Sequence, residues 1–572
     1  MTRRVVLPAL AALLLPAPVA WAVGELAQKP GAAGCISETG TGGACRDGTA
    51  LDGAFDLVAS PDGKNLYVTA NNADAVAVFD RDPATGALAQ KPGTAGCASD
   101  TGTGGLCQDA TALRSAARLA ASPDGRNVYV AAGAAGAVAV FDRDPATGAL
   151  TQKPGTAGCV SDDGVGCADG TALAGAFGVA ISADGENVYV AAIASDAVVV
   201  LDRDPATGAL TQKPGTAGCI SDTGGDGCQN GTALDGPANV ATSPDGENVY
   251  VASAGSDAVA VFDRDPATGA LAQQRGLARC VSESGSGGVC ADGAALARAA
   301  GVATSPDGST VYVASQLPGA VAVLDRNPAT GALTQKPGTA GCISDTGGDG
   351  CKNGTGLANA FDVVPSRDGR SVYVASAASS ALTVFDRDAA TGALSQKPGT
   401  AGCISDTGSG GCRDGTALGS ALGIALSPDG SSLYVSSAAS DAVAVLDRRR
   451  TSPTPPPPPP RPADTTAPTV SRLAFKPRRF RAGRRSRLRF TLSEPADVRI
   501  RIERARRHRR VGSLTRHDLP AGANTVRFRG RIGRRRLAAG RYRAVVTATD
   551  PAGNRSTPRR TRFTITRARG PS

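Results

Sequence analysis

The sequence predicts an all-β protein whose larger part is a seven-bladed β-propeller closed by an N-terminal strand. A unit of about 61 residues recurs seven times, and each unit alternates apolar and polar residues with a period of two. Paired cysteines mark the period, because the first members of successive pairs lie 62, 62, 60, 61, 62 and 61 residues apart. Four short antiparallel strands in each of several repeats are typical of a propeller.

One repeat shows the expected strands. The short apolar segment 238–242 is followed by a turn at 243–246, in which Pro244 fixes φ and Gly246 accepts a positive φ. β-Branched and aromatic residues then predict a second strand at 248–253. The rest of the unit is a third strand, a turn and the start of a fourth strand, at 257–263, 265–269 and 271–274.

The two ends of the repeat region predict how the ring closes. The chain enters with a fourth-strand segment at 25–30, whereas the last unit ends after its third strand at 442–446. Pairing these segments completes one blade and leaves no free sheet edge. An open solenoid is the alternative, but it needs capping repeats of different sequence. The long connections from fourth to first strands then share one face, which is the candidate binding face because loops carry function.

Fourteen cysteines form seven local pairs, whose partners are separated by seven to nine residues, mostly Gly, Ser, Asp and Thr. The repeats contain no histidine and the spacing varies, so the pairs suit a disulfide better than a zinc site. In an exported chain they predict seven disulfides, each closing one loop. The predicted pairs are Cys35–Cys45, Cys97–Cys107, Cys159–Cys167, Cys219–Cys228, Cys280–Cys290, Cys342–Cys351 and Cys403–Cys412.

The first 22 residues predict a secretory signal peptide. Arg3 and Arg4 precede an apolar stretch at 5–19, and Ala20-Trp21-Ala22 offers a small-x-small cleavage site. The stretch is short for a membrane span, which disfavours an uncleaved anchor. Thr2-Arg3-Arg4 leaves twin-arginine export open beside the general route. We therefore expect a secreted or envelope-associated monomer without a membrane span.

Composition divides the chain into a signal peptide at 1–22, the propeller with its Cys-closed loops at 23–448, a Pro-rich linker at 449–466 and an Arg-rich domain at 467–572. From residue 461 to the end, 32 Lys and Arg against 6 Asp and Glu give a net charge of +26. Residues 1–460 carry 29 basic and 45 acidic residues, hence −16. The whole-chain value of +10 thus hides an acidic propeller joined to a basic tail.

The Arg-rich domain alternates apolar and Arg residues, as a β-sandwich with a solvated outer face does. With Ala467-Pro468-Thr469 at its start and Thr549-Asp550-Pro551-Ala552-Gly553-Asn554 near its last hairpin, it resembles bacterial immunoglobulin-like domains. Two explanations of the Arg excess stay open: codon bias in a GC-rich genome, or a basic domain that binds an anionic envelope polymer by electrostatic attraction. Nucleic acid is not expected as the partner of an exported chain. The predicted strands are 471–475, 487–492, 497–502, 525–529, 542–548 and 561–565.

Most propeller units carry Ser-Pro-Asp-Gly, Tyr-Val and Val-x-Val-x-Asp in that order. They resemble the YVTN-type repeat and the seven-bladed lactonase-like propeller family. The first unit is closest, with Tyr67-Val68-Thr69-Ala70-Asn71, and the resemblance covers 25–448. It implies either ring opening of sugar lactones or a surface role without chemistry. The Cys-closed loops depart from the family's shorter blade.

One position, at the start of each first strand, differs between repeats and should ring the mouth of the central channel. Asp56, Asn239 and Asp362 are the candidate residues for a cation or small polar ligand, unless the channel is simply solvated. The catalytic alternative is Asp56, Arg118 and Asp362; otherwise no catalytic residue is expected, because no repeat gains a His or Glu there. A solvated Asp with a pKa near 4 is a weak base at neutral pH. The ring positions are Asp56, Arg118, Gly178, Asn239, Gly301, Asp362 and Gly423.

Two Cys loops also suit Ca²⁺, because they combine carboxylates with flexible glycines. The candidate ligands are Asp222, Asp226, Asp345 and Asp349. Neither loop supplies the bidentate acid of a specific motif, so no metal or other cofactor is expected, with Ca²⁺ as the alternative.

Two functions follow. The first is a secreted binding or scaffold propeller without catalysis, whose basic tail docks to an anionic envelope polymer and whose Cys-loop face meets a protein or glycan. The alternative is a lactonase-like hydrolase with its site at the channel mouth. A lactonase needs a base at one asymmetric place, whereas the repeats are nearly uniform, and this favours the first.

Overall fold

The structure is a computed structural model, and it describes residues 24–348, 350–449, 466–481, 484, 486–505, 510–533 and 535–567. The chain divides into two compact units between Pro453 and Thr454. The predicted signal peptide at 1–22 and nearly all of the predicted linker at 449–466 lie outside the described residues. In the described parts, no helix combines the length and apolarity that a membrane crossing requires.

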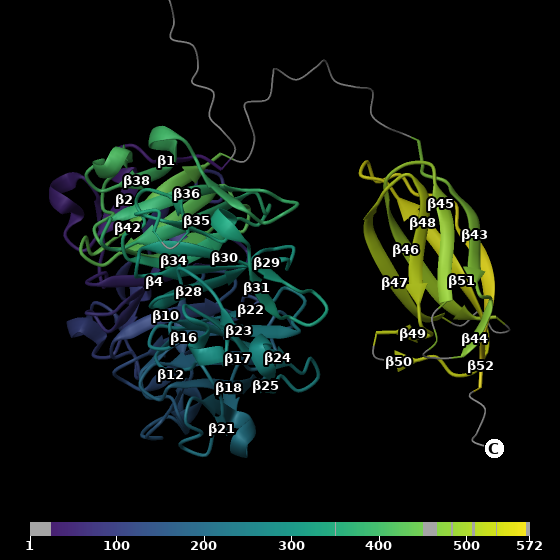
Figure 1. Cartoon of the computed structure of the whole chain (residues 1–572), viewed down its shortest axis with the longest axis horizontal. Coiled ribbons are helices and arrows are strands. Elements are labelled where there is room, and N and C mark those ends of the chain that lie inside the picture. Colours follow the sequence, from purple (N-terminus) through teal and green to yellow (C-terminus); the bar gives the residue numbers. More distant parts are fainter. Residues whose placement is uncertain are drawn as a thin grey trace, which may run out of the picture. The chain divides into compact units, whose positions relative to one another are not determined.

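The larger unit is a closed ring of seven six-stranded sheets, as a propeller requires. The innermost strand of each sheet packs beside that of the next, and β40 packs beside β4 to close the ring. The labels of β4, β28 and β34 lie together near the middle of this unit (Figure 1). The innermost strands are β4 (Ala54–Ala59), β10 (Ala116–Ala121), β16 (Ala176–Ile181), β22 (Pro237–Thr242), β28 (Ala299–Thr304), β34 (Ala360–Pro365) and β40 (Ala421–Leu426).

The second and third strands of each blade form an antiparallel pair in the middle of the sheet. Their β-branched and aromatic residues alternate, and almost all are fully buried because neighbouring blades cover both faces. The second strands are β5 (Asn65–Ala70), β11 (Asn127–Ala132), β17 (Asn187–Ala192), β23 (Asn248–Ser253), β29 (Thr310–Ser315), β35 (Ser371–Ser376) and β41 (Ser432–Ser437). The third strands are β6 (Ala75–Arg81), β12 (Ala137–Arg143), β18 (Ala197–Arg203), β24 (Ala258–Arg264), β30 (Ala320–Arg326), β36 (Ala381–Arg387) and β42 (Ala442–Arg448).

The outer edge differs from the single fourth strand predicted. Two short strands pair in succession with the same third strand, separated by a 3-10 turn that most blades begin after a Pro-Gly pair. Pro has no N–H to continue the ladder, and the Gly after it takes a positive φ, so the strand breaks there. The first pieces are β1 (Leu26–Gln28), β7 (Leu88–Gln90), β13 (Leu150–Gln152), β19 (Leu210–Gln212), β25 (Leu271–Gln273), β31 (Leu333–Gln335) and β37 (Leu394–Gln396).

The second piece starts at the first cysteine of each pair and is followed by a two-residue outermost strand that runs parallel to it. The second pieces are β2 (Cys35–Ser37), β8 (Cys97–Ser99), β14 (Cys159–Ser161), β20 (Cys219–Ser221), β26 (Cys280–Ser282), β32 (Cys342–Ser344) and β38 (Cys403–Ser405). The outermost strands are β3 (Arg46–Asp47), β9 (Gln108–Asp109), β15 (Ala168–Asp169), β21 (Gln229–Asn230), β27 (Ala291–Asp292), β33 (Lys352–Asn353) and β39 (Arg413–Asp414).

The predicted closure of the ring is confirmed, with a more detailed register. Leu26 pairs with Arg448 and Gln28 with Leu446, so β1 takes the place of a fourth strand on β42. The second piece, β2, then pairs Cys35 with Ala444 and Ser37 with Ala442. The N-terminal segment thus supplies the whole outer edge of the last blade.

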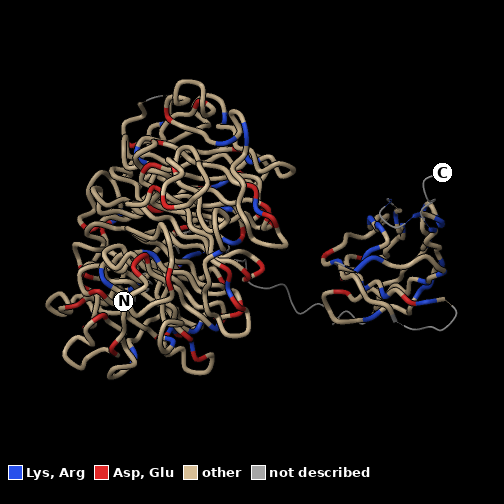
Figure 2. Tube along the Cα trace, turned by 90° about the horizontal axis from the view of Figure 1, so that it is seen from below, with Lys and Arg blue, Asp and Glu red and all other residues tan. Residues whose placement is uncertain are grey.

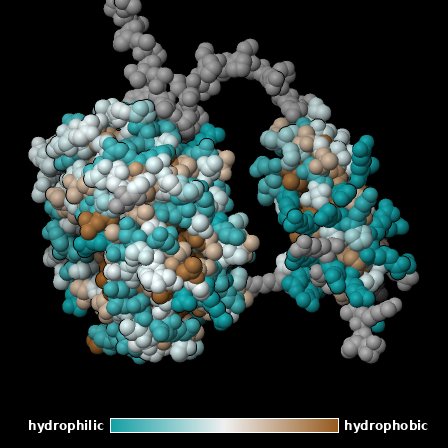
Figure 3. All heavy atoms as spheres, viewed as in Figure 1, coloured by the Kyte–Doolittle hydropathy of each residue, from teal (hydrophilic) through white to brown (hydrophobic). Residues whose placement is uncertain are grey.

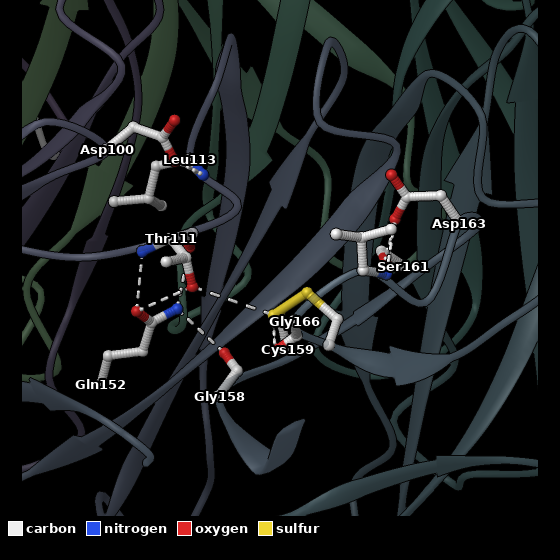
Figure 4. Close-up of a disulfide and its surroundings, with 11 residues drawn as sticks. Asp100, Thr111, Leu113, Gln152, Gly158, Cys159, Ser161, Asp163 and Gly166 are labelled. Atoms are coloured by element: carbon white, nitrogen blue, oxygen red, sulfur yellow. Dashed lines mark hydrogen bonds between the residues drawn. A yellow bond between two sulfur atoms is a disulfide. The ribbon is translucent and has the colours of Figure 1, made fainter. Parts of the chain in front are cut away.

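Seven disulfides close the predicted loops, each between the predicted partners, and the described residues include no free cysteine. Figure 4 shows the Cys159 disulfide beside the segment that enters the same blade. Gln152 Nε2 donates to the carbonyl oxygens of Thr111 (2.8 Å) and Gly158 (3.0 Å), and Thr111 N–H donates back to Gln152 Oε1 (2.8 Å). Each fourth strand therefore holds both the start of its own Cys loop and the loop arriving from the blade before.

All seven Cys loops lie on one face, as predicted. The residue that directly follows the second piece of each outer strand donates its backbone N–H to a carbonyl oxygen in the turn between the second and third strands. Asp100 donates in this way to Asp74 (3.0 Å), and Asp222 donates to Asp196 (3.0 Å). The tight Ser-Pro-Asp-Gly turns end the opposite side of the blades. We call the side that carries the Cys loops the Cys-loop face.

The interfaces between blades carry a repeated polar network that begins with an Arg at the end of each third strand. In one copy, Arg326 Nε donates to Tyr250 Oη (2.6 Å), and Arg326 Nη2 lies 2.8 Å from Asp245 Oδ2. The hydroxyl of Tyr250 in turn donates to the Gly331 carbonyl (2.9 Å). Both the Tyr and the Asp belong to the preceding blade, so each network joins two blades. The seven Arg–Tyr pairs are Arg81–Tyr434, Arg143–Tyr67, Arg203–Tyr129, Arg264–Tyr189, Arg326–Tyr250, Arg387–Tyr312 and Arg448–Tyr373.

Ionisation states favour this network. Burial raises the pKa of Tyr189 and of Tyr312 to about 12, so their hydroxyls stay protonated and donate. Burial alone would raise the pKa of Asp245, but hydrogen bonds from Ser243, the Glu247 N–H and Arg326 hold it below its usual range. The turn Asp of each Ser-Pro-Asp-Gly motif is therefore an ion-pair partner as well as a turn former.

The smaller unit contains two main sheets that share one apolar core. A three-stranded sheet has the order β43-β45-β48, and a five-stranded sheet has the order β44-β52-β51-β46-β47. Phe475, Phe490 and Phe528 from the first sheet pack in the same cluster as Ile500 and Phe563 from the second. The strands are β43 (Val470–Lys476), β44 (Arg479–Arg481), β45 (Ser486–Leu492), β46 (Ala496–Arg504), β47 (Arg510–Leu519), β48 (Gly522–Phe528), β49 (Arg531–Ile532), β50 (Arg535–Arg536), β51 (Gly540–Thr549) and β52 (Arg559–Thr566).

Each of the six predicted strands in this unit has a counterpart, whereas β47 was not predicted. Its residues alternate weakly, and its apolar residues Val511, Leu514 and Leu519 only partly reach the core. The pairing of β47 with β46 places it at the sheet edge, where little burial is required of it.

We predict that Tyr250→Phe lowers the stability of the propeller. The change leaves Arg326 Nε and the Gly331 carbonyl without a partner in a buried place, which costs on the order of 1–3 kcal/mol. The measurement is the urea concentration at the unfolding midpoint. As the control, Asp325→Asn removes the half-exposed acid of an ion pair with Lys336 and should change stability by about 1 kcal/mol or less. If the two substitutions lowered the urea midpoint equally, the interblade network would not contribute to stability as we infer.

Candidate functional site

A β-bulge at the start of each innermost strand shapes the channel mouth on the Cys-loop face. The register between first and second strands shifts at this point in every blade, for example between Ala54 and Asp56 in β4 and between Ala360 and Asp362 in β34. A bulge re-aims side chains near a barrel or propeller axis. The seven variable positions identified in the sequence all lie at these bulges.

The structure brings Asp56, Arg118 and Asp362 together. Arg118 Nη1 lies 3.3 Å from Asp362 Oδ1 and 3.9 Å from Asp56 Oδ1, although its blade is three blades away from that of Asp362 in the ring. All three residues are buried, with exposures of 8%, 5% and 5% in chain order. We call this group the axial triad. It is not the open, solvated ring considered from the sequence.

The two carboxylates of the axial triad also join adjacent blades. Asp56 Oδ2 accepts the N–H of Leu119 in the next innermost strand (3.1 Å), and Asp362 Oδ2 accepts the N–H of Ile424 in the next one (3.1 Å). The bulges leave these N–H groups free of the ladder, so the carboxylates satisfy them. Both acids therefore have scaffold partners in addition to Arg118.

Three phenylalanine rings cluster at the axis, one of them against Arg118 of the triad, and the sequence analysis did not identify them. Phe55 packs edge-on against Phe177 (5.3 Å between centroids) and against Phe361 (5.6 Å). The guanidinium of Arg118 lies over the Phe361 ring at 5.4 Å, a cation–π contact. Each Phe directly precedes a bulge residue, and this was the signal in the sequence that could have placed the rings at the axis.

Burial is the main cause of an unusual ionisation at Asp56. It raises the pKa of Asp56 to about 6; Arg118 opposes the rise, and Asp362 adds to it. A solvated carboxyl with a pKa near 4, as expected from the sequence, is therefore wrong for Asp56. A carboxyl that titrates near pH 6 has the proton affinity of a general acid or base, but Asp56 is only 8% exposed.

Asn239, the third predicted ligand residue, does not join the triad in any described contact. Its Oδ1 accepts the N–H of the next residue, Val240 (2.8 Å). Close packing explains the glycines of the ring: a Cβ on Gly423 would lie 2.8 Å from Asp56 Oδ1, and a Cβ on Gly301 would lie 3.0 Å from the Asp362 Cα. The glycines thus make room for the acids of the neighbouring blades.

The guanidinium of Arg118 keeps two unused donors. Nε and Nη2 are buried and have no hydrogen-bond partner among the described residues. Such donors are normally satisfied by water or by a ligand oxygen. An oxygen acceptor placed next to Arg118 would satisfy these donors.

The structure gives the proposed Ca²⁺ ligands other partners. Asp222 Oδ1 accepts the N–H of Leu234, and Asp345 Oδ1 accepts that of Leu357, both at 2.9 Å. Asp226 has a positive φ of 56° in its turn, and Asp349 lies outside the described residues. Over the described residues, no three His, Cys, Asp or Glu side chains are grouped as a metal site requires. Calcium binding by these loops stays a prediction.

Comparisons with known proteins agree with a propeller. The model of the family described as "Lactonase, 7-bladed beta-propeller" matches residues 291–404. No curated protein matches the chain.

Among solved structures, the periplasmic gluconolactonase of Pseudomonas aeruginosa is 20% identical over 60% of this chain and 83% of its own, with a TM-score of 0.41. A proposed 6-phosphogluconolactonase of Bacteroides uniformis is 21% identical over 59% and 82%, also at 0.41. The hydrazine synthase of Kuenenia stuttgartiensis is 18% identical over 71% and 98%, with the same score. Neighbours of such different names do not decide the function of this chain.

We predict that Asp56→Asn changes how stability depends on pH. The folded pKa of about 6 lies above the ordinary value of 3.8, so the fold favours the protonated acid. Wild type therefore loses up to about 3 kcal/mol of stability as pH rises from 4 through 6, and the Asn variant lacks this loss. Melting temperatures of both proteins from pH 4 to 8 check this. A constant difference between the two across that range would show that Asp56 titrates normally.

Proposed function

We propose that this protein is a secreted binding or scaffold propeller without catalysis. The observation that carries the proposal is the axial triad, whose carboxylates bond to Arg118 and to backbone N–H groups of neighbouring blades. These contacts favour a structural role for the acids that a hydrolase would need as bases. The seven disulfides support an oxidising compartment outside the cytoplasm.

The Cys-loop face is the proposed contact surface for a protein or glycan. Its loops are held by disulfides and by the Gln and Asp hydrogen bonds described above, so little ordering is needed when a partner binds. The loops also differ where they are most exposed: Leu106 is 60%, Val165 77% and Val289 43% exposed. Such apolar side chains on rigid loops are suited to contact a partner.

We further propose that the smaller unit is an immunoglobulin-like domain that attaches the propeller to an anionic envelope polymer. Its two sheets around one core are consistent with that fold. Lys and Arg are distributed over this unit with few acids among them (Figure 2), and the space-filling view shows mostly hydrophilic side chains there (Figure 3). The sequence assigns +26 to this end of the chain.

We expect residues 23–572 to be retained on an anionic matrix at low salt, and residues 23–448 to pass through. Surface charges are screened beyond about 8 Å at physiological ionic strength, so retention should weaken steeply as NaCl increases. Column elution against a salt gradient measures this. Retention that is indifferent to salt, or equal for both chains, would refute electrostatic docking.

A lactonase-like hydrolase is the second candidate, because the family model matches 291–404 and Asp56 has a pKa of about 6. In this function Asp56 or Asp362 would activate water and Arg118 would polarise the lactone carbonyl through its unused donors. The three rings would then have to move for the substrate to enter.

We expect no hydrolysis of sugar lactones or acyl-homoserine lactones above background, with or without added Ca²⁺. The assay follows acid release by pH-stat. Turnover that Asp56→Asn and Asp362→Asn both abolish, while Asp325→Asn on the propeller surface leaves it intact, would establish the hydrolase instead.

A further inference from the structure

The C-terminal unit has a concave site on the outer face of its five-stranded sheet. The pocket has a volume of about 240 Å³. Its floor is formed by Val545 and Thr547 of β51, which are only 3% and 9% exposed. The remaining residues that line it are Arg499, Arg501, Arg555 and Pro558.

Strand pairing fixes two of the three arginines. Arg499 pairs with Thr547 and Arg501 with Val545 in the β46–β51 ladder, so both guanidinium groups leave the sheet on the same side. Their Cα atoms are two residues apart along β46, roughly 7 Å. Arg501 Nε lies 2.8 Å from Glu503 Oε1, which holds its side chain against the sheet.

The turn after β51 fixes the third arginine. Asp550 Oδ1 accepts the N–H of Asn554 (2.8 Å), and Ser556 Oγ accepts the N–H of Ala548 (2.8 Å). A β-bridge between Thr549 and Arg555 brings Arg555 back to the end of β51. The Asp550–Asn554 motif, singled out in the sequence as a hairpin feature, thus also positions a cation.

The charges of this pocket are not balanced by acids. Glu503 is shared by Arg501 and Arg543, and Asp497 bonds to His517 and to the Asp518 N–H. Within the described residues, neither Arg499 nor Arg555 forms an ion pair. Two or three guanidinium groups around one opening repel one another, and an anion relieves this repulsion.

We propose that this pocket binds a phosphate group, which is the unit by which the C-terminal unit recognises its anionic polymer. The inference rests on the proposed docking function and assigns its contact point. Three guanidinium groups around one opening present donors from different directions; the tetrahedrally arranged oxygens of a phosphate can meet them, whereas the two oxygens of a planar carboxylate point to one side. The Thr547 hydroxyl at the floor offers one more donor.

The opposite face of the same unit provides a matched control. On the three-stranded sheet, Arg487 and Arg527 face each other across β45 and β48, and Arg489 follows on β45. These residues are exposed cations like those of the pocket, and none of them lines it. Removing three charges from either face changes the net charge equally.

The test compares R499Q/R501Q/R555Q with R487Q/R489Q/R527Q in the full mature chain. On phosphocellulose we expect the pocket variant to elute at clearly lower NaCl than the control variant. Titration with inorganic phosphate should show at least tenfold weaker binding for the pocket variant and little change for the control. On a carboxymethyl matrix the two variants should elute close together.

Equal losses by both variants would overturn the pocket and leave docking by diffuse charge. A parent chain that neither matrix retains would instead refute the proposed docking function itself. A third outcome is that only the pocket variant loses inorganic phosphate binding while both variants elute from phosphocellulose at the same NaCl concentration. This result would show that the pocket binds free phosphate rather than the polymer, and it would also overturn the assignment. Circular dichroism confirms folding, and if the triple variant unfolds, R555Q on the exposed turn should weaken phosphate binding at least threefold.

Discussion

The architecture depends on one interaction between neighbouring blades, the bond from a third-strand Arg to the Tyr of the blade before it. Each Arg is nearly fully buried, so it is stable there only when a neighbour supplies the Tyr hydroxyl and the turn carboxylate. An open chain of blades would leave the first Arg and the last Tyr without partners. In the closed ring, Arg81 meets Tyr434, and Tyr373 donates to the carbonyl of Gly24. The N-terminal segment therefore completes the polar network as well as the last sheet.

This constraint also explains why most of the acids do not form a site. The turn Asp residues pair with the interblade Arg, and the Asp residues at the starts of the Cys loops accept backbone N–H groups, as Asp100 does from Leu113. The Asp residues that precede the last residue of the third strands mostly pair with Lys, as Asp142 does with Lys153. What remains without sevenfold repetition is the axis, where Asp56, Arg118 and Asp362 meet, and the exposed tips of the Cys loops.

The two units divide the chemistry of the chain between them. The propeller places its interblade arginines in buried, paired positions and presents stiff loops on one face. The C-terminal unit keeps its core apolar and its outer faces cationic, with Glu503 as one of few acids in the outer rows. A cationic surface that repels itself gains free energy when it meets a polyanion, whereas residues 1–460 carry a net negative charge. The proposed attachment through one unit and display through the other follows from this difference.

The sequence alone determined the features that local patterns control. Period-two alternation and turn residues located the three inner strands of every blade, cysteines seven to nine residues apart identified their partners, and the incomplete end repeats predicted the closure. The sequence did not predict the bulges, the broken outer strand or the weakly alternating β47. These features depend on which backbone hydrogen-bonding groups are paired by neighbouring segments. The axial triad and its three rings were decided only by the tertiary structure. Arg118 and Asp362 are 244 residues apart, and only a ring of seven blades brings them within reach across the buried axis, where burial then shifts the pKa of Asp56.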